Sequence, residues 1–414
     1  MQSKGQNKFK KSIILIMLAA IGPGMVVMLA DTDAGSVITA AQSGAEWGYQ
    51  LLLIQFILIP ILYITQELTV RLGACTGKGH GELIKEHFGK TCAWISVSTM
   101  LVTCVGAILT EFSGLAGVGL MFGVPKTVTL TIVVLFLISL IFTRSYKSVE
   151  KIALLIGAFE VVFFIVAWEA KPQISSMASG LLQVPIENFN YLYLMAANIG
   201  AVIMPWMIFY QQSAVVDKKL TEKDIKMSRW DTAIGSIITQ LIMAAILVAT
   251  AATLYKAHDH ASLNSVGEIS QAITPYLGHI AGVILFSLGM VGAAMIAAIV
   301  VTLTASYGSG EVVGFSHSLQ NKFKDALPFY LIYIIMLIGG ALLVCSNINL
   351  INLSVGVEVL NALCLPIVLG FLYLLARKAL PEKYKLKGTY GVIVLIILAA
   401  TSIFAFVAGI AGIF

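Results

Sequence analysis

Eleven long apolar segments, each near the length that crosses a bilayer, dominate the sequence. A membrane-spanning helix needs about 20 mostly apolar residues. Of the 414 residues, 58% are apolar and 11% are charged, against about 25% charged in a soluble chain. The predicted spans are 13–43, 48–71, 93–120, 127–144, 150–169, 191–214, 231–255, 277–306, 328–346, 352–376 and 388–412. This pattern excludes a soluble domain and predicts an all-α integral membrane protein, with residues 1–414 forming a single transmembrane domain.

The lysines and arginines predict the orientation of these segments. If the eleven spans alternate in direction, 23 of the 26 basic residues fall on one side, and the other side has only Lys126, Lys171 and Lys256. Basic residues near helix ends are retained on the cytoplasmic side. We therefore expect a cytoplasmic N-terminus and an outside C-terminus. The short loops and the absence of a targeting signal are compatible with a bacterial plasma membrane.

The first and sixth segments are poorly suited to continuous helices. The first contains Gly22-Pro23-Gly24 and then Asp31-Thr32-Asp33-Ala34-Gly35-Ser36, and the sixth contains Met204-Pro205-Trp206. Glycine and proline weaken a helix interior, so Gly35 and Pro205 mark the expected breaks. Breaks five helices apart are typical of two inverted five-helix repeats with a substrate site between them. The repeats would span about 13–169 and 191–376, with an extra helix at 388–412.

Several acids lie at membrane depth. Asp31 and Asp33 lie within the first break, and Glu111, Glu160 and Glu358 lie in the third, fifth and tenth segments. A buried acid costs about 2.5–3.5 kcal/mol even on lenient scales, so it usually has a partner, an ion or a proton. Asp33 is the main functional candidate. Asp31 and Glu111, together with Trp206 and Gln212 of the sixth segment, are candidates for an additional site or for coupling. The alternative for Asp31 is a hydrogen bond to a backbone group. On the simpler interpretation, Glu111 and Glu160 are each neutral acids paired with a neighbouring helix.

At these residues the sequence resembles the NRAMP family of divalent-metal transporters. That family carries Asp-Pro-Gly-Asn in its first helix and Met-Pro-His in its sixth. Here the first motif falls on Asp33-Ala34-Gly35-Ser36 and the second on Met204-Pro205-Trp206. Further similar stretches, in the same order, are Arg71-Leu72-Gly73, Glu82-Leu83-Ile84, Phe122-Gly123-Val124-Pro125, Asp231-Thr232-Ala233-Ile234 and Leu365-Pro366. The resemblance implies a LeuT-type fold and a divergent prokaryotic member of the family.

The resemblance also implies a ligand set for a metal ion. The ligands would be Asp33, Ser36, the carbonyl of Ala201, the thioether of Met204, and Glu358 in place of a family glutamine. Oxygen ligands suit Mn²⁺ or Mg²⁺, and a thioether favours softer transition metals over Ca²⁺.

The chain departs from the family at residues that serve proton coupling. Trp206 and Gln212 stand where the family has histidines, and an aspartate near Glu111 is missing, which argues against proton coupling by the usual family route. The six histidines present are interpreted as solvated residues of loops and helix ends: His80, His87, His258, His260, His279 and His317.

The sequence therefore predicts a secondary transporter that imports a divalent metal, Mn²⁺ before Mg²⁺, by alternating access. The metal is the transported substrate and no cofactor is expected; the other partner is the bilayer, with no nucleic acid. The alternative is a carrier of a small organic acid or amino acid, favoured by Ala34, Ser36 and Trp206. An enzyme is not expected, because paired catalytic acids normally come from different segments, whereas Asp31 and Asp33 lie together.

Overall fold

The computed structural model describes residues 22–143, 145–255, 263, 265–273, 278–346 and 350–413. Some sequence predictions fall outside these residues. They are the start of the predicted first span (13–21), the last residue of the span 127–144, the first residue of the span 277–306, and His258 and His260. Every regular element in the described ranges is helical. The prediction of an all-helical membrane protein is confirmed.

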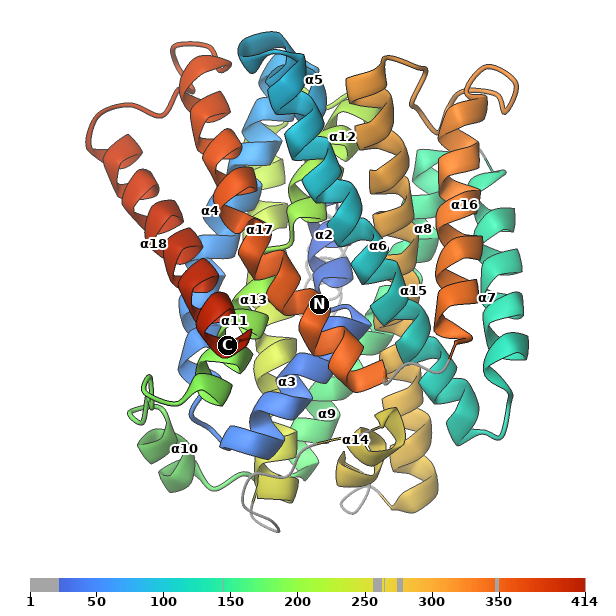
Figure 1. The fold of residues 1–414 in the computed structure, drawn as a ribbon, viewed down its shortest axis with the longest axis vertical. Coiled ribbons are helices and arrows are strands. Elements are labelled where there is room, and N and C mark those ends of the chain that lie inside the picture. Colours follow the sequence, from blue (N-terminus) through green and yellow to red (C-terminus); the bar gives the residue numbers. More distant parts are fainter. Residues whose placement is uncertain are drawn as a thin grey trace, which may run out of the picture.

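The helices follow one another along the chain with short connections (Figure 1). They are α2 (Pro23–Asp31), α3 (Ala34–Trp47), α4 (Leu52–Thr76), α5 (His80–Phe88), α6 (Lys90–Met121), α7 (Lys126–Ile141), α8 (Tyr146–Gly157), α9 (Val162–Glu169), α10 (Ile174–Gly180), α11 (Phe189–Val202), α12 (Pro205–Asp217), α13 (Ile225–Thr250), α14 (Val266–Ile273), α15 (His279–Val313), α16 (Leu327–Val344), α17 (Leu350–Lys378) and α18 (Gly388–Ile413). A 3-10 turn, η1 (Ala158–Val161), separates α8 from α9, and a π turn, η2 (Ala251–Tyr255), extends α13.

Nine helices within the described ranges are long and apolar enough to cross a membrane, and ten if the bent pair α2 and α3 forms one span. The axes of α2 and α3 differ by 46°. Helix α7 lies in the predicted span 127–144 and has 16 residues, which gives a length of about 24 Å. It is apolar but shorter than the other spans.

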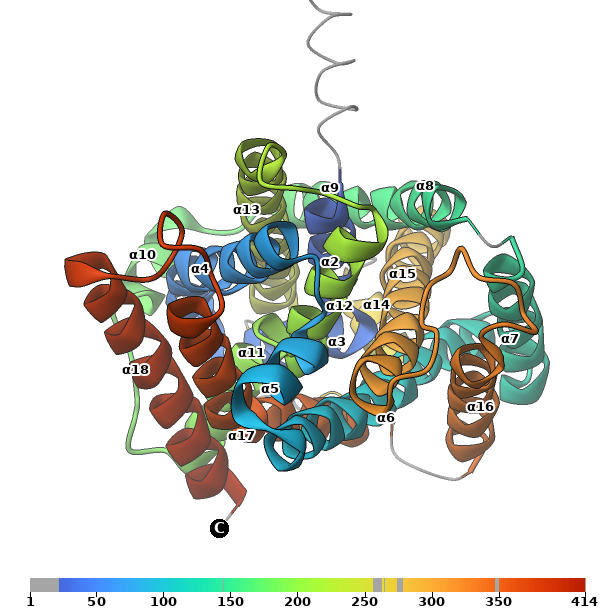
Figure 2. The ribbon, with the colours of Figure 1, turned by 90° about the horizontal axis from the view of Figure 1, so that it is seen from above.

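The short helices α2, α3, α11 and α12 lie at the centre of the bundle, with α18 on one edge and α7 and α16 on the opposite edge (Figure 2). Burial follows this arrangement. In the span Phe189–Asp217, 89% of the most apolar stretch is buried, against 39% in Gly388–Ile413. The exposed side chains on the outer helices are large and apolar, such as Ile132 and Ile403, as expected where lipid is the neighbour.

One carboxylate anchors the beginning of α2. Asp231 of α13 accepts hydrogen bonds from the backbone N–H groups of Gly22, Gly24 and Met25 at 3.0, 2.8 and 3.2 Å. The first N–H groups of a helix lack partners within the helix, and a carboxylate at that end also favours the helix dipole. A side chain at Gly24 would lie 2.7 Å from an Asp231 carboxylate oxygen, so this approach requires glycine.

Candidate functional site

The non-helical link between α2 and α3 presents Asp33. This residue is the N-cap of α3, and its Oδ1 accepts a hydrogen bond from the backbone N–H of Ser36 at 2.7 Å. The side chain is fully buried, and its Oδ2 has no hydrogen-bond partner among the described residues. One carboxylate oxygen therefore holds the helix end and the other is available to a ligand.

A second link joins α11 to α12. Helix α11 ends at Val202, and Met204, fully buried, is the N-cap residue of α12, with Pro205 at its first position. The hydroxyl of Ser36 donates to the backbone carbonyl of Ala201 at 2.9 Å. This hydrogen bond joins the link after α2 to the end of α11, so the structure brings together two of the predicted ligands from distant parts of the chain.

Glu358 of α17 lies against both of these segments. Its Oε2 accepts a hydrogen bond from Asn361 Nδ2 at 2.8 Å, and its Oε1 has no partner in the described part of the chain. A Cβ atom at Gly35 would overlap Glu358 Oε1, and a Cβ atom at Gly200 would overlap the Glu358 backbone carbonyl. At Gly200 only glycine allows α11 to approach the α17 backbone this closely, and glycine at 35 leaves room for the Glu358 carboxylate beside α3.

Glu111 of α6 holds the beginning of α3. Its Oε2 accepts a hydrogen bond from the backbone N–H of Ala34 at 3.0 Å, and the Thr110 hydroxyl donates to its Oε1 at 3.2 Å. Asp33 and Glu111 thus both serve the first turn of α3. Glu111 thus contacts the predicted site from α6, while Asp33 is the N-cap of α3.

Asp31, the last residue of α2, points towards α13. Its Oδ2 accepts a hydrogen bond from the Thr239 hydroxyl at 3.5 Å, and the Thr239 and Thr32 hydroxyls are 2.6 Å apart. The Oδ1 atom of Asp31 has no partner in the described ranges. Asp31 therefore belongs to a hydroxyl cluster beside the link, and its alternative role as a partner of a backbone group finds no support in these contacts.

Trp206 and Gln212 lie on α12 beyond the link. Trp206 is fully buried, and its indole N–H has no acceptor among the described residues. Gln212 is eight residues after Met204, which corresponds to about 12 Å along a helix. Its Oε1 is 3.0 Å from His80 Nδ1, and its Nε2 donates to the Lys78 carbonyl at 2.9 Å. Gln212 thus contacts the α5 region and not the predicted ligands.

The interpretation of His80 as a solvated loop residue is wrong. The side chain is fully buried between α5 and α12, with its ring edge-on to Phe209 at 4.9 Å between centroids. Burial lowers the pKa of His80 to about 4, although its hydrogen bond with Gln212 acts in the opposite direction. Burial penalises the charged form of an imidazole, so His80 is neutral near pH 7.

Within the described residues, no group of three or more histidine, cysteine, aspartate or glutamate side chains is placed to hold a metal ion. A cation at the link would therefore depend on two carboxylates together with uncharged ligands. Two carboxylate oxygens without partners in the described ranges, Asp33 Oδ2 and Glu358 Oε1, belong to segments that meet at Gly35. The carbonyl of Ala201 and the sulfur of Met204 are donors of the kind that completes such a set.

A pocket of about 260 Å³ lies between α3, α11 and α17, further from α5 than the two links are. It is lined by Gln42 and Glu46 of α3, Asn190, Tyr193 and Leu194 of α11, and Ile351, Asn352 and Val355 of α17. Val355 precedes Glu358 by about one helical turn, and Leu194 precedes Ala201 by about two. The pocket therefore extends along the helices that carry Asp33, Ala201 and Glu358.

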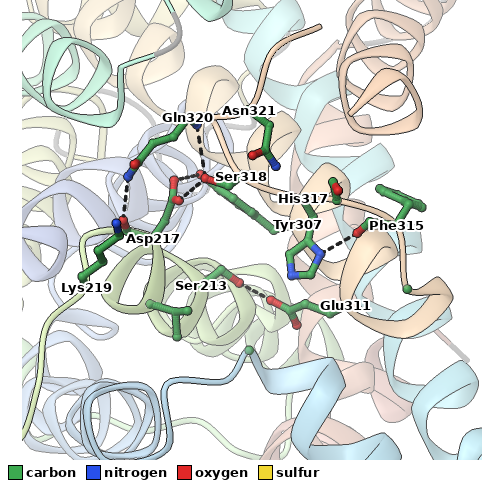
Figure 3. Close-up of a pocket in the computed structure, with 14 residues that line it drawn as sticks. Ser213, Asp217, Lys219, Tyr307, Glu311, Phe315, His317, Ser318, Gln320 and Asn321 are labelled. Atoms are coloured by element: carbon green, nitrogen blue, oxygen red, sulfur yellow. Dashed lines mark hydrogen bonds between the residues drawn. The ribbon is translucent and has the colours of Figure 1, made fainter. Parts of the chain in front are cut away.

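A second pocket, of about 490 Å³, lies at the opposite end, where α5, α12 and α15 meet. Figure 3 shows Ser213 and Glu311 pointing towards each other, and Asp217 grouped with Ser318 and Tyr307. Glu311 accepts hydrogen bonds from the Ser213 hydroxyl at 2.5 Å and from the backbone N–H of Gly81 at 2.8 Å. Through Glu311, α15 is thus hydrogen-bonded both to the beginning of α5 and to α12.

This contact is not predicted from the sequence. A single acid near the end of an apolar segment, such as Glu311, gives no sign of its partner. Gly79 and Gly81 were the available signal, since a Cβ at Gly79 would overlap the Glu311 carboxylate and one at Gly81 would lie 3.2 Å from it. Glycine at both positions indicates a close approach, but not what approaches.

Comparison with known proteins places these observations in a family. A family model described as natural resistance-associated macrophage protein-like (Nramp) matches residues 24–411. The divalent metal cation transporter MntH of Klebsiella pneumoniae (strain 342) is 27% identical over 343 residues, which cover 81% of this chain and 82% of that relative.

Solved structures share the fold. The manganese transporter of Eremococcus coleocola, in complex with an aromatic bis-isothiourea substituted compound, has a TM-score of 0.73 at 22% identity, covering 97% of this chain and 89% of that chain. MhsT in complex with L-phenylalanine has a TM-score of 0.63 at 12% identity, covering 94% and 98%. At these identities the likeness concerns the fold alone.

Proposed function

Because the chain belongs to the natural resistance-associated macrophage protein-like family, we propose that it is a secondary transporter that carries a divalent metal ion across the plasma membrane by alternating access. The observation that carries the proposal is the pair of buried, unpartnered oxygens, Asp33 Oδ2 and Glu358 Oε1, on segments that meet at Gly35. Two buried carboxylates that each keep one oxygen without a hydrogen-bond donor need a cation or protons nearby.

The proposed ligands are Asp33, Ser36, the Ala201 carbonyl, Met204 and Glu358. A thioether among oxygen donors favours Mn²⁺ or a similar transition metal over Mg²⁺ and Ca²⁺. We assign the ion as substrate, with import as the direction. The Klebsiella pneumoniae relative is named as a divalent metal cation transporter and the Eremococcus coleocola structure as a manganese transporter, which supports this choice of ion.

The proposed architecture is eleven spans in two inverted five-helix repeats, about 13–169 and 191–376, followed by a span at 388–412. The links at Thr32–Asp33 and Ile203–Met204 would then be the equivalent broken helices of the two repeats, on either side of the substrate. The N-terminus is proposed to be cytoplasmic, as the distribution of basic residues predicts. In that orientation the α5–α12–α15 contacts lie on the cytoplasmic side, and the pocket at Gln42 and Asn190 lies towards the outside.

Calorimetric titration of the purified protein in detergent with Mn²⁺, Mg²⁺ and Ca²⁺ tests the metal site. Asp33→Asn is the sharpest variant, because asparagine is also a good N-cap and the change removes the charge while retaining the cap. We expect saturable Mn²⁺ binding that is lost in this variant. Asp224→Asn is the matched control, since Asp224 is the N-cap residue of α13 and belongs to neither link. Equal Mn²⁺ binding by wild type and Asp33→Asn would refute the assignment.

Met204→Leu separates the choice of ion from the site itself. Leucine fills a similar volume without the sulfur, so we expect Mn²⁺ to lose more affinity than Mg²⁺. An unchanged ratio of the two affinities would remove Met204 from the ligand set.

A carrier of small organic acids or amino acids remains the second candidate, and one observation favours it. The N-termini of α3 and α12 both lie at the links, and helix N-termini attract carboxylates. The buried indole N–H of Trp206, which has no acceptor among the described residues, is a suitable donor for such a ligand. A thermal-shift screen with small carboxylates tests this function: stabilisation that Trp206→Phe abolishes and Met204→Leu retains would support it over metal transport.

A further inference from the structure

Glu160 is a buried acid that the proposed metal site does not use. It lies in η1, the 3-10 turn that interrupts the span Ser148–Glu169, and its side chain is fully buried. A 3-10 turn within a helix often marks a functional position, because its hydrogen-bond geometry is poorer than that of an α-helix. The residues of this turn, Ala158-Phe159-Glu160-Val161, contain no helix breaker.

Two close approaches hold this turn against neighbouring helices. A Cβ at Gly157 would lie 3.1 Å from Leu29 Cδ1 of α2, and a Cβ at Gly292 would lie 2.8 Å from the Ile156 carbonyl and 3.7 Å from the Glu160 nitrogen. The backbone around Glu160 is therefore packed between α2 and α15. Its position beside the end of α2 is fixed by contact on both sides.

The surroundings of the Glu160 carboxyl are poor in hydrogen-bond donors. Neither Oε1 nor Oε2 has a hydrogen-bond partner among the described residues. The facing part of α15, residues 288–301, consists only of glycine and apolar residues. The charged groups that face Glu160 are Asp31 and Asp33, both acidic. An ionised carboxylate without donors in such a place is very costly, whereas a protonated one is not.

One neighbouring hydroxyl can serve the protonated carboxyl. Glu160 faces the Thr32 side chain, and the Thr32 hydroxyl lies 2.6 Å from the Thr239 hydroxyl in a contact where either atom can be the donor. A threonine hydroxyl has one hydrogen and two lone pairs, so Thr32 can accept a hydrogen bond from a protonated Glu160.

We propose that Glu160 is a proton-binding site linked to the metal site: it carries a proton while the site at Asp33 is empty and releases it when a divalent cation binds there. The O–H bond of Glu160 breaks, its electron pair remains on the carboxylate, and the proton passes to the solution. The negative charge on Asp33 favours the proton, and a bound cation cancels that charge. Metal and proton therefore oppose each other's binding, and the linkage is reciprocal. This inference rests on the proposed function.

The test is calorimetric titration with Mn²⁺ at one pH near 6.5 in two buffers of different ionisation enthalpy, which gives the number of protons released per ion bound. Glu160→Gln retains the size of the side chain and cannot release a proton. We expect it to bind Mn²⁺ and to release about one proton fewer than wild type. Glu169→Gln is the matched control, because it makes the same change on the same span away from Asp31 and Asp33. It should release as many protons per ion as wild type.

The outcomes separate the two proposals. If wild type and Glu160→Gln bind Mn²⁺ and release the same number of protons, the role of Glu160 is overturned and the metal site stands. If wild type does not bind Mn²⁺, the proposed function fails, and this inference fails with it. Should Glu160→Gln not fold, Thr32→Val gives a second test, because it removes the hydroxyl that accepts a hydrogen bond from protonated Glu160: a smaller release supports the proposal and an unchanged release overturns it.

Discussion

The backbone N–H of Ala34 donates a hydrogen bond to the Glu111 carboxylate, 3.0 Å away on another helix. In the NRAMP motif that the chain resembles, this position is a proline, which has no N–H. An alanine here adds a buried donor at the first position of α3, and Glu111 supplies its acceptor. We therefore interpret Ala34 and Glu111 as a pair: the alanine provides a backbone N–H, and the glutamate provides the acceptor that this N–H needs.

The first prediction tests this pairing. Glu111→Ala leaves the Ala34 N–H without a partner, which costs about 1–3 kcal/mol, and should lower the melting temperature and weaken Mn²⁺ binding. Ala34→Pro should restore much of the loss in the double variant, because proline removes the N–H and suits the first position of a helix. Asp33, with φ −70° and ψ 174°, already has the extended conformation that proline requires before it. Independent, additive losses would contradict the pairing.

The hydrogen bond between Ser36 and the Ala201 carbonyl should contribute to metal affinity. Ser36→Ala removes a proposed ligand together with a hydrogen bond that is itself worth about 0.5–1.5 kcal/mol, so we expect Mn²⁺ to bind more weakly by at least about 2-fold in calorimetry. Ser306→Ala on α15 is the control, because that hydroxyl bonds only to a carbonyl of its own helix in the described structure. Equal affinities for the two variants would mean that the Ser36 bond does not support the site.

Gly200 should not tolerate a side chain. A Cβ there would overlap the Glu358 backbone carbonyl, and overpacking of this kind typically costs about 1–3 kcal/mol or more. Gly200→Ala should lower the melting temperature clearly, whereas Gly370→Ala on α17, which meets nothing within 4 Å, should leave it unchanged or raise it slightly. Similar melting temperatures for the two variants would show that α11 and α17 can separate at little cost.

Acidification should destabilise the protein through His80. Burial lowers the pKa of His80 to about 4 from its ordinary value of 6.5, so the unfolded chain binds the proton more readily than the folded one. Stability from this group is present above pH 6.5 and is lost as the pH falls towards 4, by roughly 3 kcal/mol at most. Between pH 7.5 and 4, the melting temperature should fall less steeply for His80→Gln than for wild type. His87→Gln, at an exposed position of the same helix, should follow wild type.

The all-helical membrane fold could be predicted because its cause is local. Long apolar segments with satisfied backbone groups have few alternatives in a bilayer. The helix ends at Asp31 and Val202 also lie at residues that carry local signals, namely a run of Asp, Thr and Ser after one helix and Pro205 after the other. Each signal acts within a few residues, so it can be read without knowing the partner helices.

The contacts of His80, Glu311 and Glu160 could not be predicted in the same way. Each depends on a helix distant in the chain: Gln212 for His80, Gly81 for Glu311, and the Thr32 hydroxyl for Glu160. The 3-10 turn that contains Glu160 has no proline or glycine within it. Its conformation follows from packing against α2 and α15, and one sequence does not reveal that packing.

The anchoring of α2 by Asp231 limits where the protein can flex. Three N–H groups of α2 are bonded to one side chain of α13, so these two helices should behave as one rigid body. The chain between α2 and α3 consists of Thr32 and Asp33. A change in the angle between α2 and α3 must therefore be absorbed by the torsions of two residues, one of which is the proposed metal ligand. A metal ion bound to Asp33 would then restrict the backbone torsions of this two-residue link.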